Sequence, residues 1–481
     1  MSHPRSDDRR WLALVVLCVG MLMIVLDNTV VNVALPSIQH DLAFSQANLA
    51  WVVNAYMIAF GGLLLLAGRL GDLIGSKRVF ITGLVVFTLA SLLCGLSWLR
   101  ELLVAARFLQ GVGGAMASSV ILAMIVTTFA EPRERAKALG IFSFTASAGG
   151  SIGLLLGGVL TQLLNWHWVF LINVPIGIAA VVLAMRLLDA EEGIGLREGA
   201  DGLGAFLVTA SLMLAVYTVV EIPVQGATSA HTLWCAVAAL VLFVAFVARQ
   251  ATAAKPLLPL RLLRSRNVAG TNVLQLLLVA GMYGFFFLDA LYLRQVSRYD
   301  AVGTGLAFLP VTVTIGALSL GWSARLAARF GARAVLIGGI TLAAVGLAIF
   351  AVAPLQGAYA TTIFPAMVLL GVGLGVAFPS LMLFAMAGAT PRDAGLTSGL
   401  VNTTAQVGGA FGLAILAALS AARTHGAVAA GMNASDALAA GYHVAFGTAA
   451  GCLAVAALVA ATVLQPAELD GAQTVSHSVA A

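Results

Sequence analysis

Apolar runs of membrane-spanning length recur along the whole chain, and this feature restricts the fold more than any other. As a helix, each run can cross the roughly 30 Å of a bilayer's hydrocarbon core. Hydrophobic residues make up 61% of the 481 residues and charged residues 9%, whereas about a quarter of the residues in a soluble domain are charged. The sequence therefore predicts an all-α polytopic membrane protein with fourteen transmembrane helices, at about residues 11–35, 50–67, 79–97, 102–126, 138–161, 168–186, 203–221, 232–249, 268–293, 303–324, 334–353, 360–385, 395–421 and 442–464.

The basic residues predict the orientation of these helices. The first apolar run follows Arg5, Arg9 and Arg10 but is too long for a secretion signal and shows no small-residue cleavage site, so we expect a retained helix. With the N-terminus in the cytoplasm, the cytoplasmic segments hold 20 of the 25 Lys and Arg residues, in agreement with the positive-inside rule. Both termini are therefore predicted to be cytoplasmic.

Three repeated patterns indicate an internal duplication. The charged, glycine-rich stretch at 68–78 is repeated in a degenerate form at 325–333, the Gly-Val-Gly at 111–113 returns at 371–373, and EPRE at 131–134 resembles TPRD at 390–393. The offsets of 256 to 260 residues are nearly constant. We therefore expect cytoplasmic tails at 1–10 and 465–481, six-helix halves at 11–188 and 268–464, and an inserted segment at 189–267 that holds the helix pair at about 203–221 and 232–249. Two such halves are a transporter architecture, with the substrate site at their interface.

Four ordered motifs resemble those of the major facilitator superfamily and its fourteen-helix drug:proton antiporter family. The stretch RLGDLIGSKR at 69–78 is similar to the superfamily's loop between helices two and three. The other three resemble the antiporter family's motifs in helices one, four and six: LDNTVVNVALP at 26–36, RFLQGVGG at 107–114 and WVFLINVPIG at 168–177. The resemblance covers essentially the whole chain and implies the major facilitator fold with two inserted helices.

The resemblance also implies a function: proton-coupled efflux, or antiport, of hydrophobic, cationic or amphipathic drugs and antibiotics by alternating access. The proton motive force would supply the energy, with no cofactor, metal or nucleic acid, and the protein would act as a monomer in the bacterial cytoplasmic (inner) membrane. The sequence shows no nucleotide loop, His-Glu-x-x-His pattern or paired catalytic acids, so we do not expect an enzyme. The alternatives are a metabolite importer or facilitator of the same fold, and a membrane sensor or intramembrane enzyme.

Asp27 is an acid inside an otherwise apolar run. A charge there costs several kcal/mol unless it is paired or hydrated, so we expect Asp27 to face a water-filled cavity and to alternate between a proton and a cationic substrate. The alternative is a packing residue bonded to Asn28, Thr29 or Asn32.

Arg107 is the one basic residue placed within a predicted span, and its counterpart in the second half is the uncharged Met367. The family resemblance implies a proton-coupling role for Arg107. A guanidinium favours the ionised form of a nearby carboxylate, so Arg107 would help Asp27 release its proton. The alternative is an arginine that extends to the outer interface.

Asp289 is a second acid within a predicted span, and we assign it to proton coupling and to the substrate cavity, or alternatively to an outer ion pair with Arg294 or Arg298. Polar and aromatic residues on the first and later helices complete the predicted cavity, although each also suits ordinary helix packing. The cavity set is Asp27, Asn32, Gln275, Phe286, Asp289, Tyr292, Asn402 and Gln406.

Two further groups of residues are predicted to control the conformation. Asp72 is expected to contact the positive N-terminus of a helix in the other half and so to latch the cytoplasmic side; the latch set is Gly68, Arg69, Gly71, Asp72, Gly75, Lys77, Arg78, Arg133 and Arg392. Gly149, Gly153, Gly157 and Gly158 allow close packing of a gate helix. The family's Gly-Pro-x-x-Gly-Gly motif has Leu154 here in place of proline, which removes a built-in kink.

Overall fold

The computed structural model describes residues 7–464 apart from 130, 190–192, 194, 196–200, 255, 259, 354–358 and 388–393. The described part is helical and confirms the all-α membrane fold. The first half contains α1 (Asp7–Asp41), α2 (Gln46–Leu49), α3 (Trp51–Ile74), α4 (Ser76–Gly95), α5 (Arg100–Thr128), α6 (Pro132–Leu163), α7 (Trp168–Leu171) and α8 (Asn173–Leu187). The inserted pair is α9 (Gly202–Gln225) and α10 (Ala230–Thr252).

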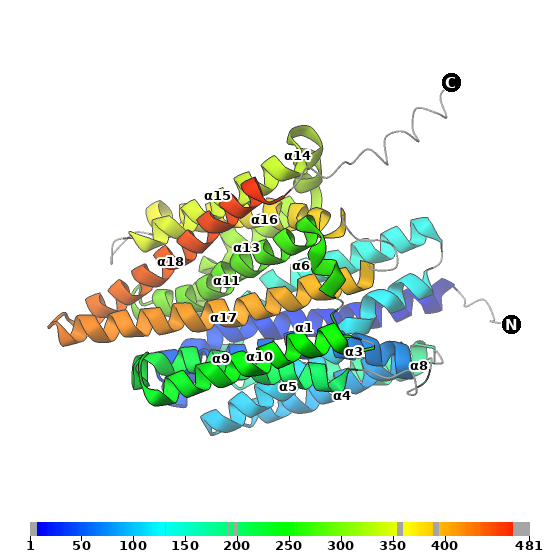
Figure 1. Cartoon of the computed structure of the whole chain (residues 1–481), viewed down its shortest axis with the longest axis horizontal. Helices are drawn as coiled ribbons and strands as arrows, with labels where there is room; N and C mark the ends of the chain where they lie inside the picture. Colours follow the sequence, from blue (N-terminus) through cyan, green and yellow to red (C-terminus); the bar gives the residue numbers. More distant parts are fainter. Residues whose placement is uncertain are drawn as a thin grey trace.

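The second half begins after the short turn η2 (Leu260–Arg264) and again consists of long helices. It contains α11 (Arg266–Gln295), α12 (Ala301–Ala307), α13 (Leu309–Ala317), η3 (Leu318–Trp322), α14 (Ser323–Phe330), α15 (Ala332–Ala351), η4 (Tyr359–Ile363), α16 (Phe364–Ala387), α17 (Ala394–Ala429) and α18 (Ala434–Thr462). The long helices of both halves run side by side along one axis of the molecule (Figure 1).

Among the described residues, twelve helices are long and apolar enough to cross a membrane. The two other predicted spans are also helical: one lies within α6, which runs from Pro132 to Leu163, and the other contains the apolar segment Ala301–Ala317. The span expected at 303–324 is not one continuous α-helix: it breaks at Phe308 and ends in the π-turn η3. Pro310 contributes to the break because its nitrogen cannot donate the hydrogen bond of a helix interior.

The stretch at 68–78 is mostly helical rather than an open turn. Helix α3 continues to Ile74, and only Gly75, with φ of +97°, separates it from α4. Gly331 has φ of +83° between α14 and α15, at the position the sequence repeat predicts. Glycine adopts this left-handed conformation at no steric cost, so the duplicated motif encodes the same tight connection in both halves.

Matching glycine contacts hold equivalent helix pairs together. A Cβ atom on Gly83 of α4 would lie 2.8 Å from the carbonyl oxygen of Gly113 of α5, and one on Gly339 of α15 would lie 2.7 Å from that of Gly373 of α16. Small residues at a crossing let two helix backbones approach closely. The second half therefore repeats the α4–α5 packing in its α15–α16 pair.

The two halves contact each other through α1 with α11, α3 with α17 and α6 with α12. Polar contacts bridge the halves at one end of the bundle, which we call the Gln162 end. Gln295 donates to Gln39 (2.8 Å), and Gln162 donates to Asp300 (3.0 Å). The backbone N–H of Gly303 and the Gln162 amide hold the pKa of Asp300 below its usual value, so this bridge contains an ionised carboxylate at neutral pH.

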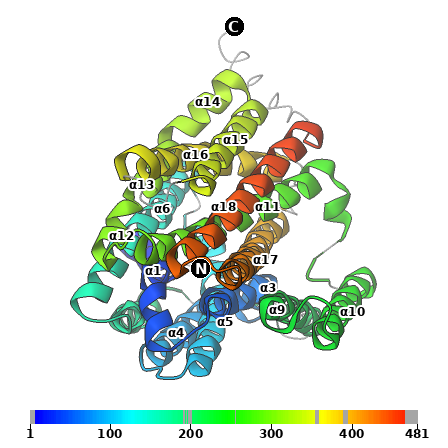
Figure 2. The same cartoon turned by 90° about the vertical axis from the view of Figure 1, so that its left-hand side faces the viewer.

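The inserted pair lies beside the junction of the two halves (Figure 2). Helix α9 packs on both α3 and α17, and α10 packs mainly on α9. Asp201 fixes the end of this hairpin opposite to the Gln162 end: it accepts from the Gly204 nitrogen (3.0 Å), from Arg249 (3.0 Å) and from Gln250 (2.8 Å). The pair is thus a braced hairpin attached to the bundle through one of its two helices.

Candidate functional site

Asp27 and Arg107 form an ion pair in the interior of the first half. Nη1 of Arg107 on α5 lies 2.5 Å from Oδ2 of Asp27 on α1. Each residue is 1% exposed. Two charges removed from water in this way need close pairing and further hydrogen bonds to be stable.

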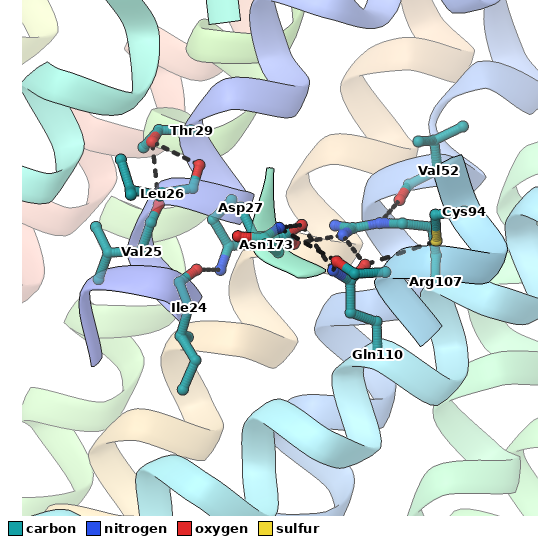
Figure 3. Close-up of polar contacts among 12 residues, drawn as sticks. Ile24, Val25, Leu26, Asp27, Thr29, Val52, Cys94, Arg107, Gln110 and Asn173 are labelled. Atoms are coloured by element: carbon teal, nitrogen blue, oxygen red, sulfur yellow. Dashed lines mark hydrogen bonds and ion pairs between the residues drawn. The ribbon is translucent and has the colours of Figure 1, made fainter. Parts of the chain in front are cut away.

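Three polar side chains complete the hydrogen bonding of this pair, and two of them, Gln110 and Asn173, are labelled in Figure 3. Gln110 donates to Oδ1 of Asp27 (2.7 Å) and accepts from Arg107 (2.7 Å), so its amide bridges the two charges. Asn173 of α8 donates to the same carboxylate oxygen (3.3 Å). Ser91 of α4 accepts from Gln110 (2.6 Å) and from Asn173 (3.2 Å). We call these five residues the Asp27 cluster.

Arg107 has further partners that do not depend on Asp27. Its Nε donates to the backbone carbonyl of Val52 on α3 (2.8 Å). The guanidinium carbon lies 4.5 Å from the ring centroid of Tyr56 and 5.7 Å from that of Phe170, within the range of a cation–π interaction. These contacts hold the cation in place from the sides that Asp27 and Gln110 leave open.

Glycines on α5 bring the neighbouring helices close enough for these contacts. A Cβ on Gly111 would clash with the carbonyl oxygen of Tyr56 on α3, and one on Gly113 would clash with the nitrogen of Phe87 on α4. Because both glycines follow Arg107 within two turns, α3 and α4 approach α5 where the cluster needs Val52 and Ser91. The RFLQGVGG motif therefore supplies both the charge and the space around it.

The structure excludes the alternative positions considered for Asp27 and Arg107. Asn28, Thr29 and Asn32 bond to carbonyl oxygens of their own helix, those of Ile24, Val25 and Asn28, at 3.0 Å each, so Asp27 is not a packing residue bonded to them. Arg107 is buried and does not extend to an interface. The sequence predicted that Asp27 faces a water-filled cavity. In the structure, Arg107 and the amides of Gln110 and Asn173 surround its carboxylate instead.

Asp289 lies apart from this cluster, in the second half. It is 0% exposed, and neither carboxylate oxygen has a hydrogen-bond partner within the described residues, so the ion pair with Arg294 or Arg298 is not formed. On the same helix, Tyr292 packs edge-on against Tyr442 and Phe446 of α18, with ring centroids 6.0 and 6.2 Å apart. Asp289 is thus buried within the second half, on the same helix as Tyr292.

The other predicted cavity residues differ in exposure. Asn32 and Gln275 are buried, at 6% and 7% exposure, whereas Asn402 is exposed and Phe286 and Gln406 are half-buried. The side-chain oxygen of Gln406 is buried without a hydrogen-bond partner in the described structure. The structure does not gather these residues around Asp27.

A family model described as the Major Facilitator Superfamily matches residues 17–413. The chain belongs to the major facilitator superfamily. Curated relatives agree with this assignment over most of their length. The chain is 37% identical to the puromycin resistance protein pur8 of Streptomyces alboniger, over 98% of this chain and 95% of the relative. It is 39% identical to the cephamycin export protein CmcT of Amycolatopsis lactamdurans, over 87% and 86%.

Solved structures show the same superfamily fold. A bacterial homologue of the human lysosomal transporter Spinster, in an inward-facing and unoccupied conformation, superposes with a TM-score of 0.68 at 16% identity, covering 95% of this chain and 98% of that one. The nucleoside transporter NupG gives a TM-score of 0.63 at 13% identity, covering 94% and 100%. These matches establish the fold, and this superfamily member is a multi-pass membrane transporter and not an enzyme.

Within this transporter, the predicted latch residues lie at the end opposite to Gln162. Asp72 is exposed and forms an ion pair with Arg69 (3.6 Å). A Cβ on Gly71 would lie 2.6 Å from Val120 of α5, so this glycine allows close packing. Lys77 donates to the carbonyl oxygens of Met185 (2.9 Å) and Leu188 (2.5 Å) at the end of α8, where a cation is favoured.

The structure describes two of the remaining latch residues, Gly68 and Arg78. Gly68 lies on α3 with Ser119 3.9 Å from its Cβ position, and Arg78 is exposed. Arg392 lies outside the described residues, as does the side chain of Arg133. The N-terminus of α17, at Ala394, also lies where side chains are not described, so the contact of Asp72 with a helix N-terminus of the other half stays a prediction.

The predicted gate glycines lie on α6 and mostly face α1. Cβ positions on Gly149, Gly153 and Gly157 contact Leu22, Thr29 and the carbonyl of Val30 on that helix. A Cβ on Gly158 would instead lie 2.7 Å from the carbonyl oxygen of Ala301, at the start of α12 in the other half. Helix α6 runs through Leu154.

Sequence reasoning missed Gln110, Asn173 and Ser91. Gln110 and Asn173 lie within motifs that resemble the antiporter family, and Gln110 follows Arg107 by three residues, which places both on one helix face. An amide on the same face as a buried charge was the available signal. Ser91 had no such signal, because its role depends on the α4–α5 crossing.

Proposed function

We propose that this transporter exports hydrophobic, cationic or amphipathic antibiotics in exchange for protons, by alternating access in a bacterial cytoplasmic membrane. The relatives named for puromycin resistance and cephamycin export support an antibiotic cargo, and so does a relative from Streptomyces glaucescens, the tetracenomycin C resistance and export protein, which is 33% identical over 86% of this chain. The observation that carries the coupling is the buried Asp27–Arg107 pair.

The cluster is suited to exchanging a proton at Asp27. When Asp27 takes up a proton its charge is lost, and a buried Arg107 without compensation would be strongly destabilised. The Val52 carbonyl, the Gln110 oxygen and the Tyr56 ring each stay in contact with the guanidinium. Arg107 is therefore a fixed cation, and Asp27 is the group whose charge changes.

The energy comes from the proton motive force without a cofactor, since each charge moved through 100 mV releases about 2.3 kcal/mol. Protonation of Asp27 from outside releases the substrate outward, and deprotonation to the cytoplasm resets the site. Asp289 is the second proton-coupling candidate, and Asn32, Gln275, Phe286, Tyr292, Asn402 and Gln406 line the path when the halves separate. The protein acts as a monomer with both termini in the cytoplasm.

The test measures proton flux in inside-out vesicles with an acidic interior. Puromycin, a cephamycin, tetracenomycin C and a lipophilic cation are added in turn. We expect at least one compound to dissipate the pH gradient in the wild type and none to do so in Asp27→Asn. The matched control is Asp436→Asn, which removes an acid at the start of α18, outside the cluster, and should retain the response.

Two outcomes would contradict the proposal. Gradient loss that survives in Asp27→Asn, with equal protein inserted, would remove Asp27 from the coupling. Compound movement without any change in the gradient would indicate an uncoupled facilitator of the same fold.

A further inference from the structure

A groove of about 890 Å³ lies between the first half and the inserted pair, on the outside of the bundle. One wall is a stripe of α5 that includes Val104, Phe108 and Leu109, the other is the start of α3 with Trp51, and Met213 of α9 closes the side. Phe44 lies at the same end. This volume is that of a site for one small amphipathic molecule.

The mouth of the groove carries one charge of each sign. Arg100 and Glu101 open α5 and line the groove together with Asn48. Nε of Arg100 lies 2.8 Å from a carboxylate oxygen of Glu101, and the two side chains are 53% and 71% exposed. The charges therefore lie side by side where α5 enters the membrane.

The groove extends from these charges toward the middle of the bilayer. From Glu101 to Leu109 the α5 stripe spans eight residues, or about 12 Å at 1.5 Å per residue. The walls along this length are aromatic and aliphatic, and they include the exposed Leu109 and Ala105. A ligand that fits has a charged head with both signs and an apolar chain.

We propose that this groove binds one zwitterionic phospholipid, with its phosphate on Arg100, its ammonium group on Glu101 and an acyl chain along Phe108 toward Met213. The two exposed charges match the two charges of such a headgroup, whereas an anionic headgroup would place negative charge next to Glu101. The inference does not rest on the proposed function, because a lipid can bind here whatever the cargo.

The groove lies against the helices that hold Arg107. Trp51 and Ala55 line it, while Val52 and Tyr56, the residues that follow them on α3, contact Arg107. On α5, Phe108 lines the groove directly after Arg107. The lipid thus packs against the outer side of the same two helix turns whose inner side holds the cation.

The experiment is native mass spectrometry of the full chain purified with phosphatidylethanolamine and phosphatidylglycerol in equal amounts. Ala105→Trp fills the groove with a side chain, and Leu240→Trp on the exposed side of α10 is the matched control. We expect the wild type and Leu240→Trp to retain one phosphatidylethanolamine under activation that strips other lipids. Ala105→Trp should lose it about fivefold more readily. Equal retention by Ala105→Trp and the wild type would overturn the proposal.

A second variant tests the headgroup without filling the groove. Glu101→Lys places two positive charges at the mouth and should shift the preference toward phosphatidylglycerol by about fivefold, the scale of an exposed ion contact. Since Glu101 is largely exposed, this variant should fold even if Ala105→Trp does not. An unchanged lipid preference in Glu101→Lys, or equal binding of both lipids by the wild type, would refute the assignment to a zwitterionic headgroup.

Discussion

The buried Asp27–Arg107 pair predicts strong energetic coupling between its two members. Asp27→Asn leaves the Arg107 guanidinium buried without a countercharge, and Arg107→Gln leaves the Asp27 carboxylate buried without one. Breaking a buried pair by removing one partner costs about 3 to 5 kcal/mol. Asp27→Asn should lie at the lower end, because the Val52 carbonyl and the Tyr56 ring remain in contact with the guanidinium.

The double variant Asp27→Asn/Arg107→Gln removes both charges and leaves no uncompensated one. Its cost should therefore be smaller than the sum of the single costs by about 2 to 3 kcal/mol, the upper range for residues in direct contact. The measurement is the free energy of unfolding of the four proteins in detergent, from denaturant titrations followed by circular dichroism.

A control cycle on Arg69 and Asp72 shows what an exposed pair contributes. These side chains are 30% and 66% exposed and 3.6 Å apart, so their coupling should be at most about 1 kcal/mol. If the Asp27 and Arg107 costs simply add, to within about 0.5 kcal/mol, the carboxylate and the guanidinium do not compensate each other, and the reasoning is refuted.

Three further predictions concern packing and the ends of the bundle. Gly111→Ala should destabilise the protein by about 1 to 3 kcal/mol because the new Cβ meets the α3 backbone, whereas Gly426→Ala, with nothing within 4 Å, should change unfolding by less than about 0.5 kcal/mol. Asp201→Ala should loosen the inserted hairpin and speed amide hydrogen exchange at the start of α9, and unchanged exchange there would exclude its bracing role. Gln162→Ala removes a bridge to Asp300 and should bring the halves apart at that end more often, seen as a broader distance distribution between spin labels on α6 and α12.

The helices and the repeated motifs could be predicted from the sequence because each is encoded within a short stretch of residues. Apolar length predicts a helix without knowledge of its neighbours, and the repeat from Gly75 to Gly331 recurs as the same backbone conformation. The broken helix at 303–324 was missed because an apolar run hides a local interruption, although Pro310 was visible within it.

The candidate site could be predicted only in part. A lone acid and a lone base in apolar spans were enough to single out Asp27 and Arg107, but not to predict that they touch. Their contact joins residues 80 positions apart and depends on how closely α5 packs against α3 and α4. The amides of Gln110 and Asn173 were missed because an uncharged polar residue costs less in a membrane than a charge does. Its presence in an apolar span is therefore a weaker indication of a functional site.

The Asp27 cluster takes all its side chains from helices of the first half, and Val52 comes from that half as well. Any motion that carries the two halves as rigid bodies leaves each of these hydrogen bonds unstretched. A movement of one half relative to the other therefore neither strains nor relaxes the ion pair. Alternating access as proposed would change which solution reaches the carboxylate, while these hydrogen bonds would stay the same as the two halves move.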